Sequence, residues 1–262
     1  IKSCIIKKDF GIVNDRSFAF SRTIDSKKAF IIEKNPSERK LNNFLTLKNS
    51  PVLNKYNFEY KNNKLILKLG DKELLSIIAD DPEQKSILVN KILELESSLM
   101  KPIFLLQNDR APFFDTSHSN KVFNSISLIN LNSIKDFEKK INFKVNHERF
   151  RGNIYIEDIE PWAEFNWLDK EILINDCSFK VLKKIPRCSA TNLRINSDEQ
   201  DINLPLTLRR NYNHIDMGVY LLPLEDGEIF EGNEVFLYNG DKYLLSKIYK
   251  ISNKSWAFQT PI

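Results

Sequence analysis

Cys188 has the sequence surroundings most suited to chemistry. It follows Lys183, Lys184 and Arg187 and precedes the short polar segment Ser189-Ala190-Thr191-Asn192. Nearby cations favour the thiolate over the thiol, and a thiolate is both a soft metal ligand and a nucleophile. The alternative is a buried cysteine that packs as a small hydrophobe, because neighbours in sequence need not be neighbours in space. Cys188 is therefore either the reactive group of a site or a core residue.

Several other kinds of site lack the residues that they need. The three histidines, His118, His147 and His214, have no recognisable protease signature around them. Cys177 and Cys188 are too far apart for a zinc-binding C-x₂₋₄-C pair, and three cysteines cannot form a Cys₄ iron–sulfur site. The seven glycines are scattered singly, so no glycine-rich phosphate loop is present. These patterns disfavour cysteine proteases, zinc sites, P-loop enzymes and iron–sulfur proteins.

A set of short polar segments would suit a phosphorylated ligand if the fold brought them together. They are Lys2-Ser3, Asp15-Arg16, Asp115-Thr116-Ser117 and Arg151-Gly152-Asn153. Each of them alone is typical of a solvated turn or a surface ion pair. Together their cations, hydroxyls and amide would suit a phosphate and a polar heterocycle. Their spacing does not show whether they converge.

Aromatic residues between these segments have a structural and a functional interpretation. We expect Trp162, Phe165 and Trp167 to seal the core, with substrate stacking as the alternative. His214 and Asp216 are expected to cap a turn before a strand, or else to shape the mouth of a site.

The composition is that of a globular protein with enough apolar material for a large core. The 262 residues are 42% hydrophobic and 28% charged, which allows two domains or one large β unit. Lys and Arg outnumber Asp and Glu by 39 to 35, and no run concentrates the charge into a nucleic-acid-binding stripe. We therefore expect no nucleic acid partner.

Neither a transmembrane helix nor a secretory signal is expected in this chain. No apolar run approaches the roughly 20 residues that cross a bilayer. Three cysteines are an odd and sparse set, which points to a reducing compartment and hence to a cytoplasmic location. The chain begins at Ile1 and not at a methionine, so the presence of an earlier anchor or targeting segment stays open.

Short alternating runs predict a fold dominated by strands. N-terminal strands are expected at Phe18–Phe20, Ala29–Ile32, Tyr56–Tyr60 and Leu65–Leu69, with Asn62-Asn63 as a hairpin turn. Helices are expected at Glu83–Leu99, after the Asp81-Pro82 start signal, and at Ile134–Ile141 with Ser133 as N-cap. Later strands are expected at Arg151–Glu157, Glu171–Ile174, Ser178–Leu182, Val235–Tyr238, Lys242–Ile248 and Trp256–Gln259. The fold class is therefore mainly β with a few helices (α+β), forming a barrel or a folded-over sheet, with a domain boundary near Lys101–Pro112.

Several short motifs follow one another along nearly the whole chain. Arg149-Phe150-Arg151-Gly152-Asn153-Ile154 reads RFR-x-N-I, and Arg187-Cys188-Ser189-Ala190-Thr191 reads RC-x-x-T. Ser127–Asn132 reads S-L-x-x-L-N, and Gly218-Val219-Tyr220, Gly227-Glu228-Ile229 and Gly232-Asn233-Glu234-Val235 complete the series. Upstream lie Lys2-Ser3-Cys4 and Gly11-Ile12-Val13-Asn14-Asp15-Arg16. In this order the motifs resemble the MOSC family, the domains related to the C-terminal part of molybdenum cofactor sulfurase, together with its associated N-terminal β-barrel domain.

The resemblance implies two β-barrel domains, at residues 1–110 and 111–262, with a molybdenum–molybdopterin cofactor between them. The cysteine of RC-x-x-T is a molybdenum ligand in the family, which places that role on Cys188. The other motifs hold the molybdopterin, and they match here at Lys2, Ser3, Arg16, Thr116, Ser117, Arg151, Asn153 and Tyr220. Lys2 and Arg16 would neutralise the phosphate, and Arg187 would help to keep Cys188 deprotonated.

The resemblance to amidoxime-reducing proteins and to bacterial enzymes that detoxify N-hydroxylated bases implies an activity. It is a molybdenum-dependent oxidoreductase that removes oxygen from a small N-hydroxylated substrate. Because no second redox site is evident, the activity needs a separate electron-donor protein, either a flavoprotein reductase or a ferredoxin. Two departures, Lys48 for the arginine of T-x-R-x-x-P and Asn233 for the aspartate of the GD pair, weaken the transfer of a particular substrate.

Two other interpretations of the chain stay open. In the first, it is a carrier that binds the molybdenum cofactor or a persulfide sulfur through Cys188 without reductase activity. In the second, it is a β-barrel interaction module whose site has decayed.

Overall fold

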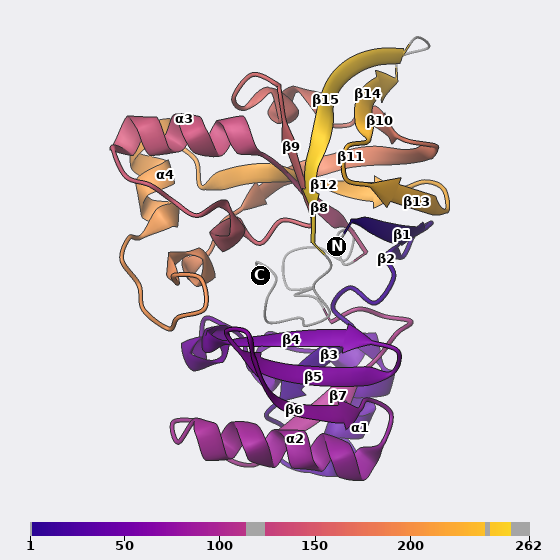
Figure 1. Cartoon of the computed structure of the whole chain (residues 1–262), viewed down its shortest axis with the longest axis vertical. Coiled ribbons are helices and arrows are strands. Elements are labelled where there is room, and N and C mark those ends of the chain that lie inside the picture. Colours follow the sequence, from indigo (N-terminus) through magenta and orange to yellow (C-terminus); the bar gives the residue numbers. More distant parts are fainter. Residues whose placement is uncertain (1, 114–123, 239–241, 253–262) are drawn as a thin grey trace.

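The computed structural model describes residues 2–113, 124–238 and 242–252, which form two units joined side by side (Figure 1). One unit holds most of the N-terminal strands and two helices, and the other holds a closed barrel with two further helices. None of the helices in these ranges is long and apolar enough to cross a bilayer. The expected class, mainly β with a few helices, is confirmed.

The barrel contains strands from the second half of the chain. It is formed by β8 (Ile126–Asn130), β9 (Ile154–Glu157), β10 (Glu171–Ile174), β11 (Cys177–Pro186), β12 (Asp216–Pro223), β14 (Glu234–Tyr238) and β15 (Lys242–Ile251), in the order β10-β11-β12-β8-β9-β15-β14. Only β8 and β9 pair in parallel, and helix α3 (Leu131–Ile141) makes the crossover between them. Inward residues such as Val181, Val219 and Leu221 are fully buried, because alternate residues of each strand face the barrel core.

The first residues of the chain belong to the barrel unit by hydrogen bonding. Strand β1 (Ser3–Lys7) lies between β2 (Gly11–Ile12) and β13 (Gly227–Phe230) in a three-stranded antiparallel sheet. Cys4 and Ile6 point into the barrel core. Gly11 has a φ of 103°, and a Cβ there would lie 2.9 Å from the carbonyl oxygen of Asn124, so a side chain has no room at this turn.

The remaining N-terminal elements form the second unit. Strands β4 (Tyr56–Lys61), β5 (Lys64–Leu69) and β6 (Lys72–Ile78) form an antiparallel meander, and β3 (Phe18–Ser21) pairs with β7 (Phe104–Gln107). Helices α1 (Ser26–Lys34) and α2 (Pro82–Leu95) and the 3₁₀ helices η1 (Pro36–Glu38), η2 (Leu41–Asn43) and η3 (Pro51–Lys55) complete it. Its core, which includes Phe18, Phe20 and Leu65, also takes in Ala190 and Leu193 from the barrel unit. The chain segment after Cys188 therefore packs into the core of the other unit.

The observed elements correct several predictions. Ala29–Ile32 is not a strand but part of α1, whose N-cap Asp25 accepts a hydrogen bond from Lys28 N, and its two ends are buried on one helix face. Helix α2 ends at Leu95, before the expected Leu99. Asn130, and not Ser133, caps α3, so that helix begins earlier than expected.

Several predicted strands are confirmed, whereas one helix was missed and one strand is shorter than predicted. The strands expected near residues 18–20, 56–60, 65–69, 171–174 and 235–238 are present, and Asn62 and Asn63 both adopt positive φ in the hairpin turn. Helix α4 (Leu204–Tyr212), capped by Asn203, was not predicted. Strand β9 begins only at Ile154, because Arg151 adopts the left-handed conformation. The strand expected at Trp256–Gln259 lies outside the described residues.

Candidate functional site

Cys188 occupies the turn between β11 and the 3₁₀ helix η6 (Ser189–Asn192), at the junction of the two units. It is partly exposed and packs against the core of the N-terminal unit. Cys4 and Cys177 are buried, and burial is the largest cause that raises the pKa of Cys4 to about 12 and raises that of Cys177. Of the three thiols, Cys188 is the one that solvent or a ligand can reach.

Buried Arg149 holds the turn after Cys188. Its Nε donates to the carbonyl of Thr191 at 3.1 Å, its Nη2 donates to the carbonyl of Asn192, and the same nitrogen lies 2.7 Å from Asp201. Thr191 closes the turn, since its hydroxyl donates to the carbonyl of Cys188 at 2.8 Å. The backbone that carries the thiol is thus held by charge-assisted hydrogen bonds.

Arg187 holds the other side of Cys188. Its Nε donates to the carbonyl of Met217 at 2.9 Å, its Nη1 donates to the carbonyl of Phe150 at 2.8 Å, and Nη2 also reaches Met217. Burial lowers the pKa of Arg187 to about 10, while charges on Tyr220, Tyr155 and Cys188 act in the opposite direction. The side chain is therefore still a cation at neutral pH, fixed to the backbone on two sides.

Arg151 connects the site to the N-terminal unit. It follows the 3₁₀ helix η4 (His147–Phe150) with a φ of 52°, and its Nη2 donates to Oδ1 of Asn54 at 3.0 Å. Nδ2 of Asn54 in turn donates to the carbonyls of Arg194 at 2.7 Å and Ser197 at 2.6 Å. Burial lowers the pKa of Arg151 to about 10, and the largest opposing influence is the charge of Cys188. A second buried guanidinium therefore lies within electrostatic reach of the Cys188 sulfur.

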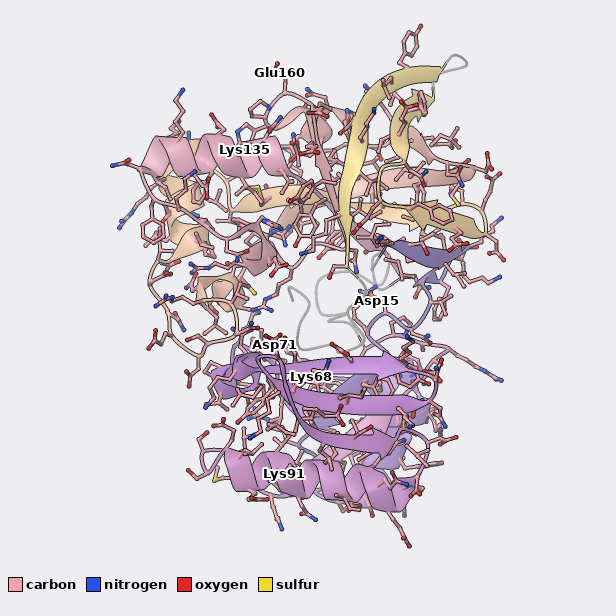
Figure 2. The ribbon with its side chains drawn as sticks, in the orientation of Figure 1. Asp15, Lys68, Asp71, Lys91, Lys135 and Glu160 are labelled. Atoms are coloured by element: carbon pink, nitrogen blue, oxygen red, sulfur yellow. The ribbon has the colours of Figure 1, made fainter. Side chains whose placement is uncertain are left out.

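Asn153 and Arg16 meet in one buried network (Figure 2 labels its Asp15). Oδ1 of Asn153 accepts from Ser127 N at 3.0 Å and Ser127 Oγ at 2.8 Å, while its Nδ2 donates to Asp15 and to the carbonyl of Ser252. Arg16 donates to Asp15 at 2.6 Å and to the carbonyl of Ser125 at 2.9 Å. Four hydrogen bonds saturate an amide side chain, so Asn153 positions strands here and would have to exchange a partner to contact a ligand.

Ser3 and Tyr220 lie on two different strands of the barrel unit, β1 and β12, and Lys2 directly precedes β1. Tyr220 stands opposite Ser127 on β8 and is buried beside Ile185. Ser3 opens β1, and the exposed Lys2 accepts at its carbonyl a hydrogen bond of 2.9 Å from Glu231 N. Glu231 also accepts from Ile251 N, next to Ser252, whose N–H donates to the carbonyl of Asn153. Thr116 and Ser117 lie outside the described residues.

A small cleft opens between the two units beside Arg151. It has a volume of about 170 Å³, and Asn54, Tyr56 and Asn57 line it on one side. Its other side includes Arg151 and the ion pair of Glu148 with Lys250. Arg151 is the proposed site residue that lines this polar cleft, and neither Cys188 nor Asn153 is among its described lining residues.

The aromatic residues have structural roles. Trp167 is buried in the barrel core. Trp162 and Phe165 surround His214, with ring centroids 5.5 Å and 5.6 Å from its imidazole. His214 Nδ1 accepts from Asp216 N at 3.1 Å, as expected for a turn before β12, and burial lowers its pKa.

The functional residues that sequence reasoning missed are defined by contacts between residues distant in sequence. Arg149 was named only as part of the RFR-x-N-I motif. No sequence pattern indicated a role for Asn54, which lies in a 3₁₀ helix of the other unit. The roles of Asp15 and Ser127 as partners of Asn153 became visible only in the network. A motif with three consecutive side chains, Arg149-Phe150-Arg151, thus serves three different contacts.

The donor set fits a metal that brings most of its own ligands. No group of three His, Cys, Asp or Glu side chains that could hold a metal occurs among the described residues. Cys188 offers one soft sulfur, and buried Arg151 and Arg187 would compensate negative charge around it. A dithiolene cofactor with a phosphate would bring further sulfur ligands and negative charge. It would therefore match both the single sulfur of Cys188 and the two guanidiniums.

Comparisons with known proteins identify a matching domain and one relative. Residues 115–236 match the family model of the MOSC domain. A segment of 94 residues is 32% identical to "Mitochondrial amidoxime reducing component 2" of Rattus norvegicus, over 36% of this chain and 27% of that protein. The chain thus matches about a quarter of the length of that relative. The chain therefore contains a region that matches the MOSC domain, and this region holds Cys188, Arg149, Arg151 and Asn153.

Proposed function

We propose that this MOSC-domain protein is a molybdenum-cofactor-dependent oxidoreductase that removes oxygen from N-hydroxylated compounds. The observation that carries the proposal is the arrangement at Cys188: a reachable thiol on a restrained turn, with two buried guanidiniums within electrostatic reach. The relative's name, which refers to amidoxime reduction, supports the substrate class. When bound, the cofactor supplies the two-electron chemistry.

The side chains divide the work of binding. Cys188 would ligate the metal, and Arg149 would keep its turn in one conformation through the carbonyls of Thr191 and Asn192. Arg151 and Arg187 would offset the negative charge of sulfur ligands, with little reorganisation because both are already held by hydrogen bonds. These residues position and neutralise the cofactor and need not exchange protons themselves.

Lys2, Ser3, Arg16 and Tyr220 would contribute charge and hydroxyl groups to the pterin end. Exposed Lys2 is suited to a terminal phosphate, because an ammonium group at a strand start can reorient toward it. Asn153 would act through the strands that it holds, since its amide is already saturated. Thr116 and Ser117 complete the proposed set.

The overall reaction requires a source of electrons and protons. Removing oxygen from R–NHOH consumes two electrons and two protons and yields R–NH₂ and water. The described residues contain no second set of redox ligands, and the protons can come from solvent at the cleft. We therefore propose a separate electron-donor protein, a flavoprotein reductase or a ferredoxin.

Turnover of a simple amidoxime tests the proposal. Protein produced in a host that makes the cofactor is supplied with benzamidoxime and reduced benzyl viologen, and benzamidine is measured. We expect turnover in the wild type and in Cys177→Ala, which removes a buried thiol, and at least a hundredfold loss in Cys188→Ala. Cofactor-loaded wild-type protein that forms no benzamidine would contradict the reductase and leave the carrier role. A fully active Cys188→Ala would contradict the role of Cys188 in the reaction.

A further inference from the structure

The C-terminal turns of α3 and α4 bring several cations to one surface. Lys139 and Lys140 lie in the last turn of α3, and Arg209 and Arg210 lie in the last turn of α4. The two ends meet where Lys140 Nζ lies 4.6 Å from the ring centroid of Tyr212. Figure 1 shows the two helices next to each other on one side of the barrel unit, and Figure 2 labels Lys135, which lies on α3 before Lys139.

Carboxylates border part of this surface: Asp136, Asp158 and Glu160 line one groove together with Lys135 and Lys139. Asp136 accepts from Trp162 Nε1 at 2.8 Å and from the Tyr212 hydroxyl at 2.7 Å. Glu138 accepts from the Val145 N–H and from Lys144, which lies beyond the helix. Within the described ranges, the four cations of the last turns and Lys135 form no salt bridge with a carboxylate.

The loop before α4 shows the opposite pattern. Its acids are each paired with a cation: Asp198 with Lys55 at 3.9 Å, Glu199 with Arg194 at 3.1 Å, and Asp201 with Arg149 at 2.7 Å. Acidic groups near the site are therefore compensated inside the protein. The cations at the ends of α3 and α4 are left to face solvent or a partner.

Exposed apolar side chains accompany the cations. Leu206 on α4 is 41% exposed, and Phe143, two residues after α3, is 40% exposed. An apolar contact with charges around it is suited to a transient protein interface, in which charge steers the approach.

The surface is directly connected to the Cys188 turn. The N–H of Leu204, the first residue of α4, donates to Oδ1 of Asn192 at 2.9 Å, and Asn192 ends the 3₁₀ helix that follows Cys188. Arg209 lies five residues further along α4, or about 7.5 Å of helix rise. A protein docked on this surface would thus sit one short helix away from the proposed metal ligand.

We propose that the α3–α4 surface, made of Lys135, Lys139, Lys140, Leu206, Arg209 and Arg210, docks an acidic electron-carrier protein. The inference rests on the proposed function, because a reductase without its own second redox centre needs such a carrier. An acidic partner is favoured because Lys140, Arg209 and Arg210 are exposed and form no salt bridge within the described ranges. The five cations of the surface also outnumber the three carboxylates that line the groove beside Lys135 and Lys139, which are Asp136, Asp158 and Glu160.

Binding of two acidic carriers tests the docking surface directly. A plant-type [2Fe–2S] ferredoxin and a flavodoxin are each titrated against the full chain in low and in moderate salt. We expect one of them to bind, with affinity that falls as salt rises, and at least a tenfold loss in Arg209→Glu/Arg210→Glu. Lys61→Glu/Lys64→Glu, a matched double reversal on the exposed β4–β5 hairpin, should bind within twofold of the wild type.

Two further measurements distinguish a failure of the proposed reductase from a failure of the proposed docking surface. Arg209→Gln/Arg210→Gln removes the charge without placing carboxylates at a helix C-terminus, so it should weaken binding even if the Glu variant unfolds. Turnover driven by reduced benzyl viologen should stay within twofold of the wild type in the Gln variant. Absent viologen-driven turnover in the wild type contradicts the proposed reductase, whereas binding that neither variant weakens, or no binding of either carrier at low salt, contradicts the docking surface.

Discussion

The Cys188 turn and the first residues of the chain are built in opposite ways, although both contribute to the candidate site. Buried Arg149 donates to the carbonyls of Thr191 and Asn192 after Cys188, and buried Arg187 directly before it donates to the carbonyls of Met217 and Phe150. Lys2 is exposed, and its one described contact is the backbone hydrogen bond from Glu231. The proposed metal-binding half is thus organised before any ligand arrives, whereas Lys2, at the proposed phosphate-binding end, can adjust.

Because of this difference, the stability of the fold and the retention of the cofactor should respond to different substitutions. Side chains that hold the Cys188 turn should affect both folding and cofactor retention, because removing them leaves buried carbonyls without donors. Residues at the start of the chain should affect cofactor retention alone. The following changes probe that separation.

The greatest contrast is expected in thiol reactivity. In the native protein without cofactor, iodoacetamide at pH 8 should modify Cys188 more than a hundredfold faster than Cys4 or Cys177. A pKa of about 12 leaves roughly one Cys4 thiol in ten thousand ionised at pH 8, and Cys177 is also buried with a raised pKa. Because a raised pKa suppresses the thiolate, Cys4 should become faster only as pH rises toward 12. Mass spectrometry of tryptic peptides measures the rates, and equal labelling of Cys4 and Cys188 would contradict the assignment.

Arg149→Met should cause the largest loss of stability. It removes the donors to the carbonyls of Thr191 and Asn192 and the ion pair with Asp201, at a cost of about 3 kcal/mol. Urea unfolding measures the change. Arg194→Met is the matched control, since Arg194 is 58% exposed and its pairs with Glu199 and Asp201 should contribute less than about 1 kcal/mol. Equal losses in the two variants would mean that Arg149 does not hold the turn.

Asn153→Ala should destabilise the protein by about 1–3 kcal/mol, because it leaves the buried Ser127 N–H and part of Asp15 without their partner. Asn211→Ala, which removes one hydrogen bond to Thr207 on α4, should change stability by less than about 0.5 kcal/mol. Urea unfolding again measures both. A loss of cofactor in Asn153→Ala with unchanged stability would instead indicate direct contact with the ligand.

Lys2→Ala should have the smallest effect on folding. Its side chain is exposed, so the free energy of unfolding should change by less than about 0.5 kcal/mol. The molybdenum content of the purified protein should nevertheless fall, because a cation near the phosphate is lost. Lys8→Ala, an exposed lysine beyond the same strand, should retain its metal. A large drop in unfolding free energy for Lys2→Ala would remove the distinction between the two halves.

The sequence predicted the strands better than it predicted the contacts between them. Alternation predicted β4, β5 and β10, since each has one buried face, but it misassigned Ala29–Ile32, because two buried residues three apart also fit a helix face. Helix α4 was missed, although Asn203 and Pro205 provide a start signal. Local pattern therefore predicts elements, and errors arise where a short apolar run fits two periods.

The site was predicted as a set of residue types and not as an arrangement. The order of the motifs indicated Arg16 and Asn153. They share a partner, Asp15, which lies 138 positions from Asn153 in the sequence. The resemblance assigned a role to Arg151 and none to Arg149, two residues away. In the structure Arg149 contacts the Cys188 turn, whereas Arg151 contacts Asn54 in the other unit. Such roles depend on long-range packing, which spacing along the chain does not encode.

Metal content tests the proposed role of Cys188 most directly. Protein from a cofactor-producing host is assayed for molybdenum by elemental analysis and for the fluorescent oxidation product of the pterin, with Cys188→Ala purified in parallel. We expect near-stoichiometric molybdenum and pterin in the wild type and loss of the metal in the variant, with the fold retained. A folded wild-type protein with neither molybdenum nor pterin, or a variant that keeps its metal, would contradict Cys188 as the metal ligand.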